Sequence, residues 1–228
     1  MPLINSIRRD IRVALERDPA ARNALEVVLA YPGFHARQLH RLAHAIWNLG
    51  VPVAPRVISH MNRAFTGIEI HPAARIGEGF FIDHGMGVVI GETTEIGENV
   101  TLYQGVTLGG TSTLRRKRHP TLGNGVVVGA GAKIIGAITI GDNARIGAGS
   151  VVVTNVPDNA TVVGVPGHIV AYHRPGNDTI ERLPDPEWDR IDDVQGQVRA
   201  LAERVVRLEA ERDRLTTELD AITGETNR

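Results

Sequence analysis

The chain has 228 residues, a formal net charge of −1 and no cysteine. The near-neutral charge argues against a nucleic-acid partner or a polybasic membrane anchor, and the lack of cysteine excludes disulfides and thiolate metal sites. The N-terminus has no signal-peptide apolar core, and no window approaches the roughly 18 apolar residues that cross a bilayer, so we expect a soluble cytoplasmic protein of one or two domains.

Residues 1–67 are predicted to form a helical domain with four helices. Apolar residues near the N-terminus recur at helical spacing. The second helix is expected to begin with Asp18 as its N-cap and Pro19 at its first position, because both residue types favour these places. The third and fourth helices are expected to end at Gly50 and Gly67.

Residues 68–173 follow a different pattern, in which aliphatic residues return at every sixth position. A six-residue period fits neither an α-helix nor an ordinary strand and is typical of a parallel β-helix built from hexapeptides. Each hexapeptide gives a short strand and a tight corner, three of them close a triangular coil, and the aliphatic side chain points into that coil. The expected inward residues are Ile70, Ile76, Ile82, Val88, Ile90, Ile96, Leu102, Leu108, Leu122, Val128, Ile134, Ile140, Ile146 and Val152.

The pattern is interrupted twice, and both interruptions carry chemically useful residues. Between Val88 and Ile90 the period slips by two residues, so the coil that carries His84 is expected to be irregular. Between Leu108 and Leu122 the basic segment "GGTSTLRRKRHPT" is expected to leave the coil as a loop. Insertions in solenoids usually emerge on a functional face.

Residues 174–190 are predicted to be a proline-rich linker, and residues 191–223 a coiled-coil helix. Apolar residues in this helix alternate at spacings of four and three, as in a heptad repeat. One such helix cannot bury its stripe alone, so we expect a three-stranded bundle; a helix folded back on its own subunit is the alternative. The stripe consists of Val194, Val198, Leu201, Val205, Leu208, Leu215, Leu219 and Ile222.

The stretch "IDHGMGVVIGET", followed by "TLGG", "KRHP" and "GAGAK", resembles the serine acetyltransferase family. The resemblance extends from about Asp10 to Val170 and includes the helical segment "GFHARQLHRLAHAIWNLG". It implies a left-handed β-helix and an enzyme that transfers acetyl from acetyl-CoA to the hydroxyl of L-serine, giving O-acetylserine for cysteine biosynthesis. It also implies a homotrimer, or a hexamer of two paired trimers.

This transfer needs a base that takes the hydroxyl proton, and imidazole suits the task because its pKa lies near neutrality. The resemblance assigns the role of base to His84. It assigns the carboxylate that orients the base to Glu69, in "EIHP", where many family members have aspartate. Glutamate keeps the charge but is one methylene longer.

The resemblance also names the groups that hold serine. Arg118 is expected to bind the substrate carboxylate bidentately, and His119 to add a donor. Asp83 and Asp18 are expected to bind the ammonium group, although the capping of a helix would by itself explain Asp18. Glu92, in the irregular coil, is expected to help shape the pocket.

Acetyl-CoA, the co-substrate, is expected to lie in a groove between two solenoids. The small residues Gly110, Ala130 and Ala148 would let its pantetheine arm approach the backbone, and Lys133 is expected to contact a phosphate. No metal is expected.

Three other functions fit parts of the sequence. An acetyltransferase of this fold for another hydroxyl acceptor, such as a sugar, would keep the same catalytic residues. A zinc carbonic anhydrase of this fold needs three histidine ligands; His168 and His173 have a suitable spacing but lie beyond the regular coils. An assembly scaffold would need the coiled coil and not the catalytic set.

Serine acetyltransferases often dock a C-terminal isoleucine into the active site of O-acetylserine sulfhydrylase. This chain ends in Arg228, and Ile222 falls on the coiled-coil stripe. Burial of an unpaired guanidinium would cost more free energy than the contact returns. We therefore expect no tail-mediated complex with the sulfhydrylase.

Overall fold

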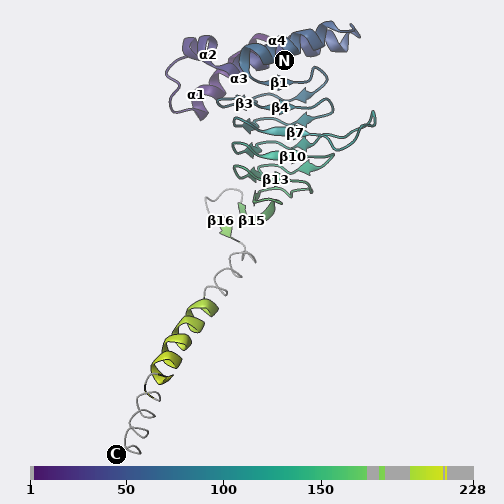
Figure 1. The fold of residues 1–228 in the computed structure, drawn as a ribbon. Helices are drawn as coiled ribbons and strands as arrows, with labels where there is room; N and C mark the ends of the chain where they lie inside the picture. Colours follow the sequence, from purple (N-terminus) through teal and green to yellow (C-terminus); the bar gives the residue numbers. More distant parts are fainter. Residues whose placement is uncertain (1–2, 174–179, 183–195, 213, 215–228) are drawn as a thin grey trace, which may run out of the picture. The chain divides into compact units, whose positions relative to one another are not determined.

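The computed structural model describes residues 3–173, 180–182, 196–212 and 214. The chain divides into two compact units, residues 1–183 and 184–228. In the first unit, helices cover one end of a stack of short strands (Figure 1). The helices are α1 (Leu3–Arg17), α2 (Ala24–Ala30), α3 (Pro32–Asn48) and α4 (Ala54–Thr66).

The prediction that Asp18 caps the second helix is wrong. Because α1 extends up to this position, residues 18–23 form the connection, and Asn23 caps α2 by accepting from the amide N–H of Glu26 at 3.0 Å. Asp18 instead accepts from the amide N–H of Ala20 at 2.8 Å, a local turn that aspartate side chains favour. The capping explanation for Asp18 therefore does not hold.

The strands form three sheets, which are the faces of a triangular prism. The first face contains β1 (Glu69–Ile70), β4 (Val89–Ile90), β7 (Thr107–Gly109), β10 (Lys133–Ile135) and β13 (Val151–Val152). The second contains β2 (Arg75–Ile76), β5 (Glu95–Ile96), β8 (Thr121–Leu122) and β11 (Thr139–Ile140). The third contains β3 (Phe81–Ile82), β6 (Thr101–Leu102), β9 (Val127–Val128), β12 (Arg145–Ile146), β14 (Ala160–Val163), β15 (His168–His173) and β16 (Ile180–Arg182).

The chain visits the three faces in turn, so each strand pairs in parallel with the strand one coil later. Ile70 lies opposite Ile90, for example, and Ile90 opposite Leu108. The end of the third face differs, because β15 pairs antiparallel with both β14 and β16.

Aliphatic side chains from all three faces fill the prism. Every inward residue predicted from the sequence is buried, except that Ile76 is partly buried against the same core. Each coil buries its apolar side chains against the next coil, as in other solenoids. The six-residue period thus predicted the parallel β-helix correctly.

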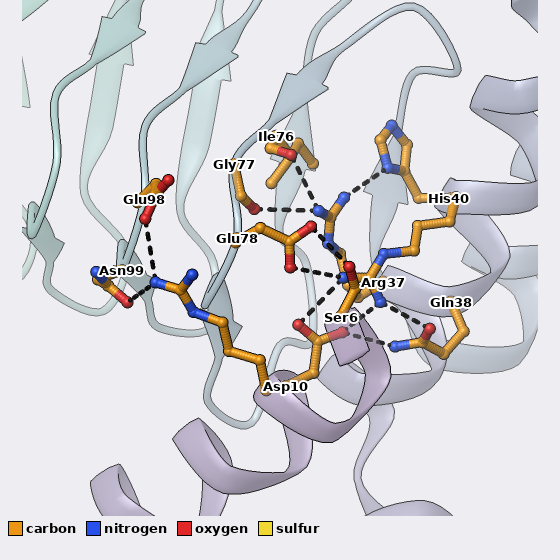
Figure 2. A network of polar contacts seen from close by, with 12 residues as sticks. Ser6, Asp10, Arg37, Gln38, His40, Ile76, Gly77, Glu78, Glu98 and Asn99 are labelled. Carbon is orange, nitrogen blue, oxygen red and sulfur yellow. Dashed lines mark hydrogen bonds and ion pairs between the residues drawn. The ribbon is translucent and has the colours of Figure 1, made fainter. Parts of the chain in front are cut away.

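Close packing holds α3 on the β-helix. Gly33 lies so near the third face that an added Cβ would be 2.1 Å from the carbonyl oxygen of Ile82. One helical turn later, the buried guanidinium of Arg37 donates to the carbonyl oxygens of Ile76 and Gly77 at 2.9 and 3.0 Å (Figure 2). The two residues lie on the same side of α3, so together they fix how the helical domain sits on the coils.

The described part of the second unit is a helix over residues 196–212 with an apolar stripe. The stripe residues Val198, Leu201, Val205 and Leu208 are each more than half exposed. Apart from residue 214, the rest of the predicted coiled coil lies outside the described residues. Ile222 and Arg228 also lie outside them. Among the described helices, none combines the length and the apolarity needed to cross a membrane.

Candidate active site

The corner that joins the third face to the first, here called the third–first corner, is longer at one level than at the others. Residues 83–88 join β3 to β4, whereas 103–106, 129–132 and 147–150 join the strands at later levels. The two extra residues account for the slip in the period. His84 adopts φ 57°, a left-handed conformation in which histidine is enriched, and its side chain is 72% exposed. The longer corner therefore presents the imidazole to solvent.

His84 lies close to two carboxylates. Its Nε2 atom is 3.9 Å from Oδ2 of Asp83. Asp18, between α1 and α2, has a lowered pKa, chiefly because of hydrogen bonds from Tyr31 and from the amide of Ala20, and the charge of His84 lowers it further. The structure thus brings together three of the predicted residues, Asp18, Asp83 and His84.

Tyr31 is a residue of this site that the sequence did not reveal. Its hydroxyl donates to Oδ2 of Asp18 at 2.5 Å. This hydrogen bond stabilises the protonated phenol beside the anion and raises the pKa of Tyr31 to about 12. In the sequence Tyr31 only precedes a proline at the start of a helix, which points to no site. We call Asp18, Tyr31, Asp83 and His84 the His84 group.

Glu69 is not brought to His84. Its Oε2 atom forms an ion pair with Nη1 of Arg63 at 3.0 Å, and the two side chains are 39% and 58% exposed. Within the described chain, no hydrogen bond or ion pair joins Glu69 to His84. Glu69 does lie on β1, directly after Ile68, and Ile68 contacts the longer corner. An added Cβ at Gly85 in that corner would be 2.5 Å from Cδ1 of Ile68. The strand therefore begins against the longer corner.

A second group of polar side chains lies where the first face turns into the second, here called the first–second corner. The segment between β7 and β8 leaves the coil as a loop, as predicted, and protrudes from the β-helix (Figure 1). At its end, the guanidinium of Arg118 pairs with the carboxylate of Glu92. The hydrogen bond from Arg118 lowers the pKa of Glu92.

His119, next to Arg118, is buried and lies against Gly91, the residue that follows β4. An added Cβ at Gly91 would be 2.0 Å from Cδ2 of the imidazole, so only glycine leaves room for this ring. Burial, and next the positive charge of Arg118, lowers the pKa of His119. The ring contacts Thr93, a further residue that the sequence analysis did not identify. We call Glu92, Thr93, Arg118 and His119 the Arg118 group.

The two groups lie at opposite edges of the first face. His84 precedes β4 and Gly91, which touches His119, follows it. Because an extended chain advances about 3.3 Å per residue, this strand and its flanks separate the groups by roughly 15–20 Å. A single chain therefore does not bring the predicted base and the predicted carboxylate-binding arginine to the same substrate.

A column of small residues continues the third–first corner from His84 along the stack. It contains left-handed glycines at four successive levels, with φ between 71° and 76°: Gly87, Gly105, Gly131 and Gly149. Added Cβ atoms at the last two, Gly131 and Gly149, would meet nothing within 4 Å. Ala130 and Ala148 directly precede two of these glycines. The surface is therefore open at the last two levels of the column, where no side chain would hinder a narrow ligand. The amides of all four glycines donate to backbone carbonyl oxygens, so they hold the coils together.

The other residues predicted to hold CoA are arranged differently. The ammonium of Lys133 donates to the carbonyl oxygen of Gly105 and, at 3.1 Å, to Oγ1 of Thr107, so it is tied to the same corner. Gly110 lies at the first–second corner, where an added Cβ would be 3.1 Å from Nε2 of His119. Among the described residues, no group of three potential ligands is placed to hold a metal ion.

A parallel β-helix of hexapeptides with an exposed histidine at a lengthened corner is the architecture of a hexapeptide-repeat acyltransferase. In agreement, residues 119–154 match the family "Bacterial transferase hexapeptide (six repeats)" and residues 1–39 match "Serine acetyltransferase, N-terminal". The chain is 52% identical over 208 residues to the serine acetyltransferase of Synechococcus elongatus, covering 87% of this chain and 85% of that protein.

Solved structures agree with the sequence relatives. The serine acetyltransferase of Neisseria gonorrhoeae, in complex with serine, is 44% identical with a TM-score of 0.71, over 74% of this chain and 69% of that one. The enzyme of Brucella abortus, in complex with coenzyme A, is 43% identical with a TM-score of 0.73, over 75% and 68%. The chain belongs to the serine acetyltransferase family, which confirms the predicted family and acyltransferase class. These relatives also imply that the β-helix is left-handed.

Proposed function

We propose that this protein transfers the acetyl group of acetyl-CoA to the hydroxyl of L-serine and so forms O-acetylserine. The observation that carries the proposal is the His84 group, which presents an exposed imidazole at the head of an open column of small residues. The relatives bound to serine and to coenzyme A support the same pair of substrates. No observation in the described structure favours a sugar or another hydroxyl acceptor.

In the proposed reaction His84 is the general base. It takes the proton of the serine hydroxyl as that oxygen attacks the thioester carbonyl, and then returns the proton to the departing thiolate of CoA. Asp83, 3.9 Å from the imidazole, stabilises the imidazolium formed in between. Ala130 and Ala148 allow the pantetheine arm to run along the column, and Lys133 remains our candidate for a phosphate contact.

We assign the orientation of His84 to Glu69, after a change of partner. Its ion pair with Arg63 is exposed, and exposed pairs contribute only about 0–1 kcal/mol. The carboxylate can therefore turn from Arg63 toward the imidazole at little cost in free energy. A carboxylate in this place would set the tautomer of the base and steady its charged form.

Serine binding requires both corners of the first face. Asp18 and Asp83 would hold the ammonium group, Arg118 and His119 the carboxylate, and Glu92 the guanidinium of Arg118. Since one chain keeps these groups apart, we propose a homotrimer in which the first–second corner of one subunit faces the third–first corner of the next. Rotational symmetry then gives three complete sites, each with acetyl-CoA between two solenoids. Pairing of two such trimers is the alternative.

The release of free thiol from acetyl-CoA tests the proposed reaction. We expect rapid release with L-serine and at most slow release with other amino acids or sugars that carry a hydroxyl. A higher kcat/KM for a sugar than for L-serine would contradict the assigned acceptor.

Mixing two inactive variants tests whether the site lies between subunits. His84→Ala and Arg118→Ala should each have little activity, because each lacks one half of every site. Refolded or co-expressed together in equal amounts, they should recover about a quarter of the activity, since a quarter of the sites in random trimers combine two intact halves. No recovery in proven mixed oligomers would place the whole site within one chain.

A further inference from the structure

Thr93 contacts three consecutive residues at the end of the 110–120 loop. Its Oγ1 atom accepts from the amide N–H of Arg118 at 3.0 Å and from that of His119 at 3.1 Å. Its carbonyl oxygen accepts from Nζ of Lys117 at 2.7 Å. One residue on the turn after β4 therefore satisfies two loop amides and one ammonium, and it joins the coil to the loop across 26 positions of sequence.

Thr93 also determines which nitrogen of His119 carries the proton. The amide N–H of Thr93 lies 3.2 Å from Nδ1 of the imidazole, and Oγ1 of Thr93 lies 2.9 Å from the same nitrogen. A backbone N–H can only donate, so Nδ1 must accept and the neutral ring carries its proton on Nε2. The Nε2 atom lies against two glycines, since added Cβ atoms at Gly91 and Gly110 would be 2.1 and 3.1 Å from it.

We propose that Thr93 is a positioning residue for the transfer reaction: it holds the end of the loop and fixes His119 as a neutral imidazole that donates through Nε2 to the bound substrate. The inference rests on the proposed function, in which Arg118 and His119 bind serine. Loss of the hydroxyl would leave the amides of Arg118 and His119 without their acceptor. The donor would then move relative to the substrate, and a displacement of 1 Å can reduce the rate about a hundredfold.

The neighbouring Thr94 provides a matched control. It is 1% exposed, and its Oγ1 atom has no hydrogen-bond partner within the described structure. The two threonines thus differ in what their hydroxyls contact, and Thr94→Val removes a buried hydroxyl that serves no partner. Thr93→Ser is the conservative variant, because it keeps the hydroxyl and removes only the methyl group.

Kinetics of the full-length chain test the inference. We expect Thr93→Val to lower kcat/KM for L-serine about tenfold to a hundredfold while the KM for acetyl-CoA is unchanged. Thr93→Ser should stay within about threefold and Thr94→Val within about twofold of the wild type. Thermal unfolding midpoints should show that all three variants are folded. Wild-type serine kinetics in Thr93→Val, or an equal loss in Thr94→Val, would overturn the inference.

A measurement on the wild-type protein keeps the inference testable even where Thr93→Val does not fold. Proton–nitrogen correlation spectra of protein labelled at histidine distinguish the two neutral tautomers from the imidazolium. His119→Asn identifies the His119 signals by their loss. We expect a neutral ring at pH 7 with its proton on Nε2, and a proton on Nδ1 would overturn the proposal.

The same variants separate this inference from the proposed function. Wild-type serine kinetics in His119→Asn would remove the substrate-binding role of His119 and with it the inference. Impaired serine kinetics in His119→Asn together with wild-type kinetics in Thr93→Val would leave the proposed function intact and overturn the role of Thr93 alone.

Discussion

At the scale of single residues, the chemistry of this protein depends on backbone positions that few residue types accept. His84 is left-handed at φ 57°, where most side chains are strained but histidine, asparagine and aspartate are enriched. Gly91 is needed because any side chain there would overlap the imidazole of His119. The backbone of the corners therefore places the side chains that we propose for catalysis and binding before any substrate binds.

Asparagine at position 84 isolates the chemistry from the conformation. His84→Asn keeps a residue that tolerates the left-handed backbone and removes the base, so kcat should fall roughly 10²- to 10⁴-fold with an unchanged thermal midpoint. Steady-state thiol release measures this effect. The control is His60→Asn, on the exposed side of α4, which should keep the wild-type kcat. A folded His84→Asn variant with wild-type turnover would contradict the role of His84.

The hydroxyl of Tyr31 provides a second prediction at this scale. Tyr31→Phe removes the main hydrogen bond that lowers the pKa of Asp18, so the carboxylate becomes less well held and its pKa rises. We expect the KM for serine to rise about three- to tenfold, which lies within the range of about 0.5–1.5 kcal/mol for one ordinary lost hydrogen bond, while the KM for acetyl-CoA stays constant.

Tyr172→Phe is the matched control for Tyr31→Phe, because Tyr172 packs against the β-helix core. It should leave both Michaelis constants at wild-type values. Equal changes in the two constants for Tyr31→Phe would show that Tyr31 acts only through packing of the helices.

At the scale of elements, α3 is the part that joins the helical domain to the coils. Its buried polar network is shown in Figure 2, where Arg37 reaches the β-helix backbone and also donates to Nδ1 of His40 at 3.3 Å. On the same helix Arg41 and Gln38 bind the buried carboxylate of Asp10 from α1. These contacts satisfy groups that would otherwise be costly to bury, so they fix the helices in one arrangement.

His40 makes this junction sensitive to acid. Burial, and next the charge of Arg37, lowers the pKa of His40 to about 3. Between the unfolded pKa of about 6.5 and this folded value, the unfolded chain binds a proton that the folded chain does not. The free energy of unfolding should therefore fall as the pH falls through this window. Burial lowers the pKa of His71 to about 4, which acts in the same direction.

Urea unfolding at several pH values between 4 and 7 measures this dependence. His40→Asn keeps an acceptor near the place of Nδ1 and does not titrate, so its free energy of unfolding should depend less steeply on pH than that of the wild type. Some slope should remain because of His71. Identical slopes in the two proteins would show that His40 does not contribute.

At the scale of the whole molecule, the trimer that we propose would complete the site. In it, a second copy supplies the other corner and joins the two groups that a face of the β-helix separates in one chain. The second compact unit carries an apolar stripe whose described residues are exposed, as expected for a surface that another helix covers. We therefore propose that the predicted coiled-coil helix, residues 191–223, strengthens the trimer without contributing to the chemistry.

Removal of this helix tests its role. A chain that ends at Arg174 should keep its activity at micromolar protein and lose it on dilution, because the trimer then dissociates. Leu201→Glu, on the stripe, should weaken the oligomer in the same way, while Arg204→Glu, off the stripe, should not. Sedimentation at nanomolar protein measures the oligomer, and an unchanged trimer in the truncated chain would contradict this role.

The β-helix was predictable because its code is local. An aliphatic residue at every sixth position buries itself against the neighbouring coils whatever the rest of the chain does, so the period predicted the core and both interruptions predicted where the chain leaves it. The family motifs then named His84, Arg118 and His119. These assignments need only the order of residues within a few coils.

The contacts between these residues were not predictable in the same way. Thr93 meets His119 and Tyr31 meets Asp18 because separate segments arrive at the same corner and level. Asn23 caps α2 in place of Asp18 because α1 extends to Arg17 and α2 begins only at Ala24. Which coil a side chain lies on depends on the lengths of all the corners before it and on how the helices pack on the first coil. A repeat period gives neither the corner lengths nor the helix packing, so it does not predict these contacts.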